Sequence, residues 1–171
     1  MDLLIHFKGM AANNTFANDR LLHACEGLSD AEFIAPRTGF FPSLCETLNH
    51  ILEVDRYYYD ALSQGGAGLT ALSTPAITSP WALRAAQARQ DGLLEVYCAS
   101  LSPDMLTEMV ATDRGDEGIV HERVCDVLAH LFQHQIHHRG QAHAMLAETS
   151  VAPPQLDEFF LAYDNNPAMV R

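Results

Sequence analysis

The sequence predicts an all-α protein, an antiparallel four-helix bundle formed as a single domain by residues 1–171. Three observations lead to this class. Four segments carry apolar residues at helical spacing and are bounded by capping residues, glycine or proline. No run of alternating strands interrupts them, which favours a bundle. A chain of 171 residues that is 48% hydrophobic is also large enough to bury one compact core.

The first helix is expected from Asp2 to Leu28, where apolar residues recur at loose helical spacing. Ser29 and Glu32 stand three residues apart, the spacing of a capping box, and predict a short helical turn. Pro36 and the segment 38–42 end that turn and form a connector.

The second helix is predicted from Ser43, which again stands three residues before a glutamate, to Gln64, just ahead of a Gly-Gly pair. The third helix is predicted from Pro80 to Leu101. Ser79 followed by Pro80 is the typical pattern of an N-cap and a first helical residue.

A small β-hairpin is expected between the third and fourth helices, with Leu106–Thr112 and Ile119–Val120 flanking the turn formers of residues 113–118. The fourth helix should run from Glu122 to Glu148 and stop before two prolines. Beyond them, Leu156–Tyr163 is predicted to form a short terminal helix that folds back on the bundle. Its anchors would be Phe159, Phe160 and Leu161.

Composition excludes several classes of function. The chain has 22 acidic and 10 basic residues, a formal charge of -12, and such a field repels nucleic acid and anionic membranes. It has no apolar run of about 18 residues and no basic segment at its start, so we expect neither a membrane span nor a signal peptide, and a cytoplasmic location. The four cysteines form no C-x-x-C pair and are expected to be reduced, half-buried thiols.

Histidines carry the functional signal. Five of the nine fall in the fourth helix: His130, His134, His137, His138 and His143. His134 and His138 are four residues apart, so both imidazoles can point at one place. They also interrupt an apolar stripe that should face the core, where a divalent cation would satisfy both rings. The pair therefore predicts two ligands of a metal site; the alternative is a helix surface that is merely rich in histidine.

A third ligand should come from a facing helix, and His50 on the second helix is the best candidate. His6 and His23 are weaker alternatives, and His50 could instead be a hydrogen-bonded core histidine. His130 and His137 are expected on a neighbouring face, either behind the ligands or on the surface. His134 is followed by glutamine where the H-E-x-x-H motif requires its general base, so protease activity is not indicated.

The stretch from His134 to Gln141, HQIHHRGQ, together with Leu128–Phe132 before it, resembles the DinB/YfiT-like family of metalloenzymes. Matches at 47–51 and 18–22 extend the resemblance over the domain. The resemblance implies a four-helix bundle, commonly a homodimer, with metal ligands at His50, His134 and His138. It implies no kinship with the lesion-bypass polymerase that shares the family's name.

Three histidine ligands leave a coordination position open, as in a catalytic site. Zinc or nickel is favoured, with iron or manganese as further candidates. Relatives suggest a thiol-dependent S-transferase or isomerase that uses a low-molecular-weight thiol on a small electrophilic substrate, and a hydrolase is a close variant. A non-catalytic metal-binding stress-response protein and a bundle without metal are the alternatives. No general acid or base is identified. Arg139 and Tyr57 are guesses for residues that line the pocket; the alternative is a surface or interhelical salt-bridge role for Arg139 and a core role for Tyr57.

Overall fold

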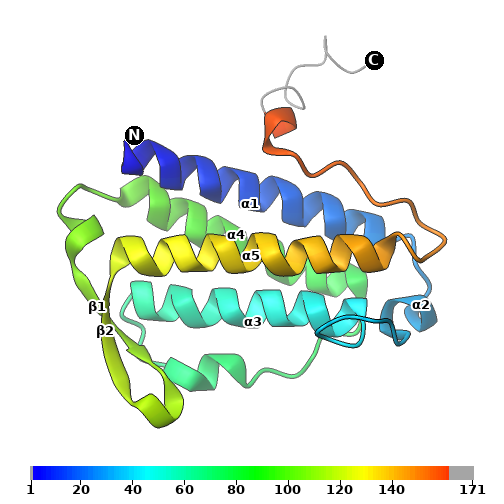
Figure 1. Ribbon diagram of the computed structural model, residues 1–171, viewed down its shortest axis with the longest axis horizontal. Coiled ribbons are helices and arrows are strands. Elements are labelled where there is room, and N and C mark those ends of the chain that lie inside the picture. The colour runs from blue at the N-terminus through cyan, green and yellow to red at the C-terminus, as the bar shows by residue number, and fades with distance from the viewer. Residues whose placement is uncertain (1, 162–171) are drawn as a thin grey trace.

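The computed structural model describes residues 2–161, and four long helices dominate it (Figure 1). They are α1 (Leu3–Cys25), α3 (Leu44–Leu62), α4 (Pro80–Ser100) and α5 (Val124–Leu146). The predicted bundle is confirmed. Helix α1 packs against α4 and α3 against α5, each pair antiparallel. Helices α3 and α4 run in the same direction, because residues 63–79, which connect them, return along the outside of α3.

Side-chain caps begin the helices where the sequence predicted. Ser29 and Glu32 form a full capping box at the start of α2 (Asp30–Ile34). The Ser43 hydroxyl accepts from the backbone N–H of Glu46 at 3.1 Å, and Ser79 caps α4 ahead of Pro80. The ends differ from expectation by a few residues, and α1 already stops at Cys25.

The predicted hairpin is present, with shifted strands. β1 (Met109–Asp113) pairs antiparallel with β2 (Ile119–Arg123). Leu106 therefore belongs to a 3-10 turn and not to a strand, and Glu122 belongs to β2 and not to the last helix. Tertiary contacts explain the second difference, because the Glu122 carboxylate pairs with Arg114 at 2.7 Å and so holds its own residue in the hairpin.

The predicted terminal helix is covered only in part. Glu158–Phe160 form a 3-10 turn and Leu161 is helical, whereas residues 162 and 163 lie outside the described range. Phe159 and Phe160 are 62% and 38% exposed, so they do not anchor the segment in the core. Polar contacts hold the preceding chain instead: His143 Nε2 lies 2.9 Å from the carbonyl oxygen of Pro154, and Arg20 donates to the carbonyl oxygen of Gln155.

Two apolar clusters fill the bundle, one toward the hairpin and one toward α2. A layer of buried polar side chains separates them along the helices. Its members are Asn14, Asn18, Asp55, Gln87, Gln90, Asp91, Gln135 and Arg139. Arg139 is only 5% exposed and donates to Asn14 Oδ1 at 2.7 Å and to Asn18 Oδ1 at 3.0 Å. The guess that Arg139 lines the metal pocket is therefore wrong: its side chain turns toward α1.

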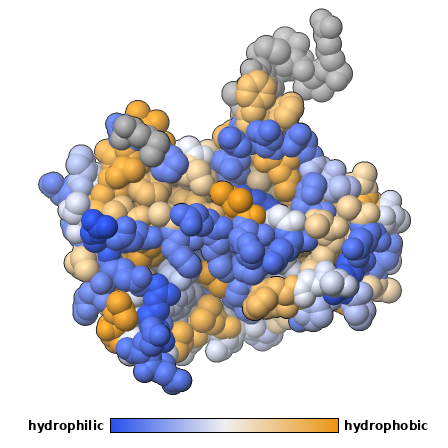
Figure 2. All heavy atoms as spheres, in the orientation of Figure 1, coloured by the Kyte–Doolittle hydropathy of each residue, from blue (hydrophilic) through white to orange (hydrophobic). Residues whose placement is uncertain are grey.

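The remaining sequence-based expectations concern membranes and thiols. No helix within residues 2–161 is long and apolar enough to cross a bilayer. Hydrophilic residues instead form a broad band over α5 on the face shown in Figure 2. The cysteines are free thiols, as predicted, but Cys25, Cys45 and Cys98 are buried and not half-buried.

Candidate metal centre

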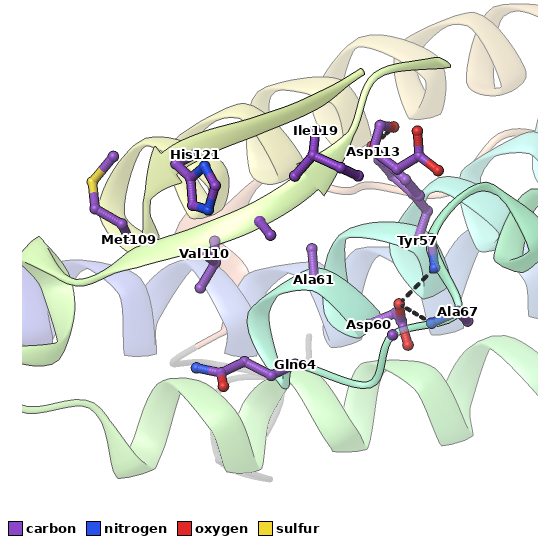
Figure 3. Close-up of a pocket in the computed structure, with 13 residues that line it drawn as sticks. Tyr57, Asp60, Ala61, Gln64, Ala67, Met109, Val110, Asp113, Ile119 and His121 are labelled. Atoms are coloured by element: carbon purple, nitrogen blue, oxygen red, sulfur yellow. Dashed lines mark hydrogen bonds between the residues drawn. The ribbon is translucent and has the colours of Figure 1, made fainter. Parts of the chain in front are cut away.

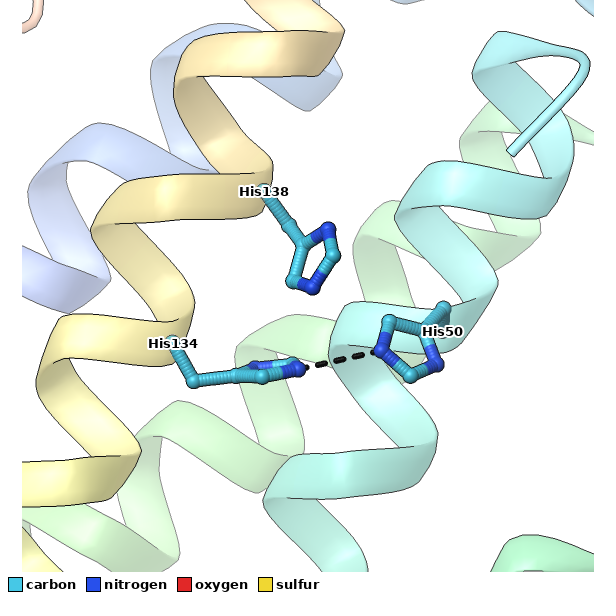
Figure 4. Close-up of side chains that lie close together, drawn as sticks. All are labelled: His50, His134 and His138. Carbon is cyan, nitrogen blue, oxygen red and sulfur yellow. Dashed lines mark hydrogen bonds between the residues drawn. The ribbon is translucent and has the colours of Figure 1, made fainter. Parts of the chain in front are cut away.

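Three imidazoles meet in the groove between α3 and α5. His50 comes from the middle of α3, and His134 and His138 come from consecutive turns of α5 (Figure 4). The Nε2 atoms of His50 and His134 are 3.0 Å apart, and one ligand atom from each residue lies within 4.8 Å of the others. The structure thus brings together all three histidines that the sequence selected.

The protonation of these rings suits a cation. Burial, followed by the neighbouring imidazoles, lowers the pKa of His50 to about 4 and that of His134 to about 3, and burial also lowers the pKa of His138. All three are therefore neutral at pH 7 and offer lone pairs. A tetrahedral ion with Zn–N bonds of about 2.0–2.1 Å spaces its ligand atoms by about 3.3 Å. Since the ligand atoms all lie within 4.8 Å of one another, each pair would have to close by no more than about 1.5 Å, which side-chain rotation can supply.

Gln141 orients one of the rings. Its Oε1 atom, which can only accept, lies 2.8 Å from His138 Nδ1, so Nδ1 carries the proton and the Nε2 lone pair is left for a metal. The Gln141 amide nitrogen in turn lies 3.1 Å from His137 Nε2. His137 therefore acts on the centre through Gln141, in line with its predicted place behind the ligands.

An aromatic cover, Phe40 and Phe41, lies against one side of the triad. The Phe41 ring centroid is 4.3 Å from that of His50 and 5.6 Å from that of His138. Phe40 is 78% exposed and more distant, at 6.4 Å from the His138 ring. The sequence marked this segment only as a connector. In the structure its two aromatic rings lie over one side of the imidazoles.

A cavity of about 330 Å³ opens on the other side, and His134 is part of its wall. His130 also lines it, with a ring centroid 6.2 Å from that of His134. The prediction that His130 is rotated away from the pair is wrong, because His130 and His134 are themselves four residues apart on one face. Tyr57 lines this cavity, as guessed. Tyr58 and Arg114 also line it, and both were missed because they reach it from α3 and the hairpin.

The weaker histidine candidates lie outside the cluster. His23 Nδ1 is 2.9 Å from a carboxylate oxygen of Glu26, and the ring of His6 lies against that of Phe7. A larger cavity, of about 470 Å³, lies at the end of α3 beneath the hairpin (Figure 3). It shares Tyr57 and Asp113 with the smaller cavity, but none of the triad lines it, so of these two cavities the smaller one adjoins the triad.

The arrangement defines a class: a helical bundle with a half-buried three-histidine centre between two antiparallel helices. The family follows from the comparisons. The model of the DinB family matches residues 5–168, and the chain belongs to that family.

One solved structure, a DinB-like protein from Bacillus cereus ATCC 10987, aligns with a TM-score of 0.64 at 17% identity, over 82% of this chain and 91% of that one. At this identity the match supports the fold alone. No curated protein matches the chain.

Proposed function

We propose that this protein is a divalent-metal-dependent enzyme acting on a small electrophilic molecule, with His50, His134 and His138 as the metal ligands. One observation carries the proposal: three neutral imidazoles converge from two helices, and Gln141 orients His138 so that its Nε2 lone pair is free. Zinc and nickel are the favoured ions, because imidazole suits both.

The environment of the triad suits nucleophilic chemistry. A bound divalent ion would lower the pKa of a thiol or water molecule in its open position and so supply a nucleophile at neutral pH. Phe41 shields one side of the site, and the cavity beside His134 leaves the other side open to a substrate. We favour a thiol-dependent S-transferase or isomerase with a low-molecular-weight thiol as co-substrate, and hydrolysis as the variant.

The second candidate is a non-catalytic metal-binding stress-response protein. The partner of His138 favours it, because Gln141 is an amide, whereas a carboxylate in that place would make the imidazole a stronger ligand. A neutral partner suits reversible binding of an ion.

The first test is metal content. Protein produced without a histidine tag should hold about one equivalent of a divalent metal by plasma mass spectrometry, the occupancy of one three-ligand site. The variant with His50, His134 and His138 replaced by alanine should hold almost none. A control with His6, His23 and His121 replaced by alanine removes as many imidazoles outside the cluster and should load normally. Equal trace amounts in all three proteins would end the metalloenzyme proposal.

Activity separates the two candidates. Zinc- and nickel-loaded protein is assayed with monochlorobimane plus a small thiol, and with para-nitrophenyl acetate without thiol. His134→Ala should lose both metal and turnover if the protein is an enzyme. Metal binding with no turnover in the wild type on either substrate favours the binding protein.

The proposal includes a homodimer. Large apolar side chains are exposed on two neighbouring helices, including Ile5 on α1 and Trp81 and Val96 on α4 at 70%, 71% and 71%. A second copy that packed against these two helices would remove this apolar area from water. Light scattering coupled to size-exclusion chromatography tests the state directly, and a mass of one chain would contradict it.

A further inference from the structure

We infer that the cavity beside His134 is the substrate site of this centre and that it selects a molecule with an apolar body and a single carboxylate, which Arg114 binds. The inference rests on the proposed function, since the metal centre would act on the molecule held there. It adds what that function leaves open, the chemical class of the substrate.

The cavity has the size and the walls of a small-molecule site. Its volume of about 330 Å³ lies at the lower end of the range for ligand pockets. His134 and His130 line it from α5, and Leu69 and Leu72 line it from the 3-10 turn Gly68–Leu72. One part of the wall therefore leads to the imidazoles, and another is aliphatic.

Hydrogen bonds fix the orientation of the Arg114 side chain at this cavity. Its Nε and Nη2 atoms donate to the Glu122 carboxylate at 3.2 and 2.7 Å, and Nη1 donates to the Tyr58 hydroxyl at 2.8 Å. The side chain is only 28% exposed. Because an arginine has five N–H groups, Nη1 retains a second N–H that these contacts do not use. A guanidinium fixed in this way loses little conformational entropy when it binds an anion.

Two carboxylates lie near Arg114, those of Asp113 and Glu122, and Asp113 lines the same cavity, so the donor offered to a ligand is the directed N–H of Arg114 and not a net positive charge. The Asp113 carboxylate accepts from the backbone N–H of Gly115 at 3.1 Å, within its own turn. Glu122 is already engaged by Arg114. Because the chain as a whole carries a charge of -12, a multiply charged anion would be repelled, whereas a single carboxylate can accept the one Nη1 N–H that Arg114 leaves unused.

The test compares hexanoate with 1-hexanol and hexylamine, which share its apolar body, by calorimetric titration of zinc-loaded and metal-free protein. Hexanoate should bind at least about tenfold more tightly than the other two. Arg114→Met should abolish that difference and leave the affinity for hexanol unchanged. The matched control is Arg123→Met, because Arg123 is a hairpin arginine that pairs with Asp126 and does not line the cavity; it should keep the preference.

Arg114→Lys provides a second test in case the methionine variant misfolds. Lysine can keep the ion pair with Glu122 but lacks the planar guanidinium, so this variant should still lose several-fold in hexanoate affinity. Equal affinity for hexanoate and hexanol would overturn the inference, since the cavity would then not recognise the carboxylate. Hexanoate binding that requires zinc and is unchanged in Arg114→Met would also overturn it, since the carboxylate would then bind the metal. The two proposals fail separately. Protein that binds no zinc but still prefers hexanoate through Arg114 would refute the metal centre alone, and zinc-loaded protein without the preference would refute this site alone.

Discussion

Asp55 is a carboxyl group in the middle of the bundle, 1% exposed. Gln87 Nε2 donates to its Oδ2 atom at 2.8 Å and also to Asp91 at 2.9 Å, so one amide joins two carboxyl groups. Burial, followed by Asp91, raises the pKa of Asp55 to about 8. Asp55 is therefore protonated at neutral pH and can donate from Oδ1 to the neighbouring Gln135 amide, which has no other partner among the described residues.

This protonation makes stability depend on pH. A carboxyl group whose pKa is higher in the folded state holds its proton more tightly there, so the free energy of unfolding falls as pH rises from about 4 to about 8. Asp55→Asn keeps a donor and an acceptor without ionisation, and should raise the free energy of unfolding at about pH 8 by about 1–3 kcal/mol.

Urea denaturation at about pH 6 and about pH 8 measures the change. The gain should be larger at the higher pH. Asp116→Asn alters an exposed aspartate in the hairpin turn and should change little. An Asp55→Asn protein less stable than the wild type at about pH 8 would contradict a protonated Asp55.

Helix α5 presents two adjacent polar faces. His134 and His138 point toward α3, while the next residues, Gln135 and Arg139, face the buried polar layer. Since successive residues turn by about 100° on a helix, contacts on both faces fix the rotation of α5 about its axis. The candidate metal centre and the buried layer thus depend on one helix orientation.

Arg139→Met tests this dependence. It leaves the buried Asp91 carboxylate without its cation and should lower the free energy of unfolding by about 3–5 kcal/mol. Arg89→Met changes an exposed arginine on α4, and should cost less than about 0.5 kcal/mol. Chemical denaturation measures the free energy of unfolding of both variants. Equal values for Arg139→Met and Arg89→Met would show that the buried arginine does not stabilise the fold.

The connector before α3 is an element that acts on the centre. Because Phe41 lies against the His50 ring, Phe41→Ala should admit water and speed the transfer of bound zinc to a chromophoric chelator by about tenfold. Phe40→Ala is the control, since that ring is mostly exposed. Stopped-flow absorbance follows the release, and identical rates for wild type and Phe41→Ala would rule out a shielding role.

At the scale of the whole molecule, the centre joins two helices that are far apart in sequence. His50 and His134 are separated by 84 residues, so a metal bound to both would hold α3 against α5. At free zinc about 100 times the dissociation constant, binding adds about 2.7 kcal/mol to the free energy of unfolding. For a domain of this size, that corresponds to a rise in Tm of about 5–10 °C.

Scanning calorimetry with and without zinc measures the rise. A chelator should reverse it, and the variant with His50, His134 and His138 replaced by alanine should show none. An equal rise in that variant would place the zinc elsewhere on the chain.

Local chemistry explains what could be read from the sequence alone. Helix starts at Ser29, Ser43 and Ser79 are visible in sequence, because a cap acts on backbone N–H groups two or three residues away. The spacing of His134 and His138 is just as local, because four residues make about one helical turn. These features determined the bundle and two members of the candidate centre, and the need for a ligand from a facing helix pointed to His50, which the family resemblance then supported.

Only the tertiary structure decided the surroundings of the centre. Phe41 contacts the triad from a connector, and Tyr58 and Arg114 line the cavity beside it from a facing helix and a hairpin. No periodicity along one segment encodes such contacts. The parallel course of α3 and α4 and the burial of Arg139 likewise depend on which helices become neighbours. Contacts between distant segments depend on how the whole chain packs. Sequence patterns report on a few neighbouring residues and therefore do not predict these contacts.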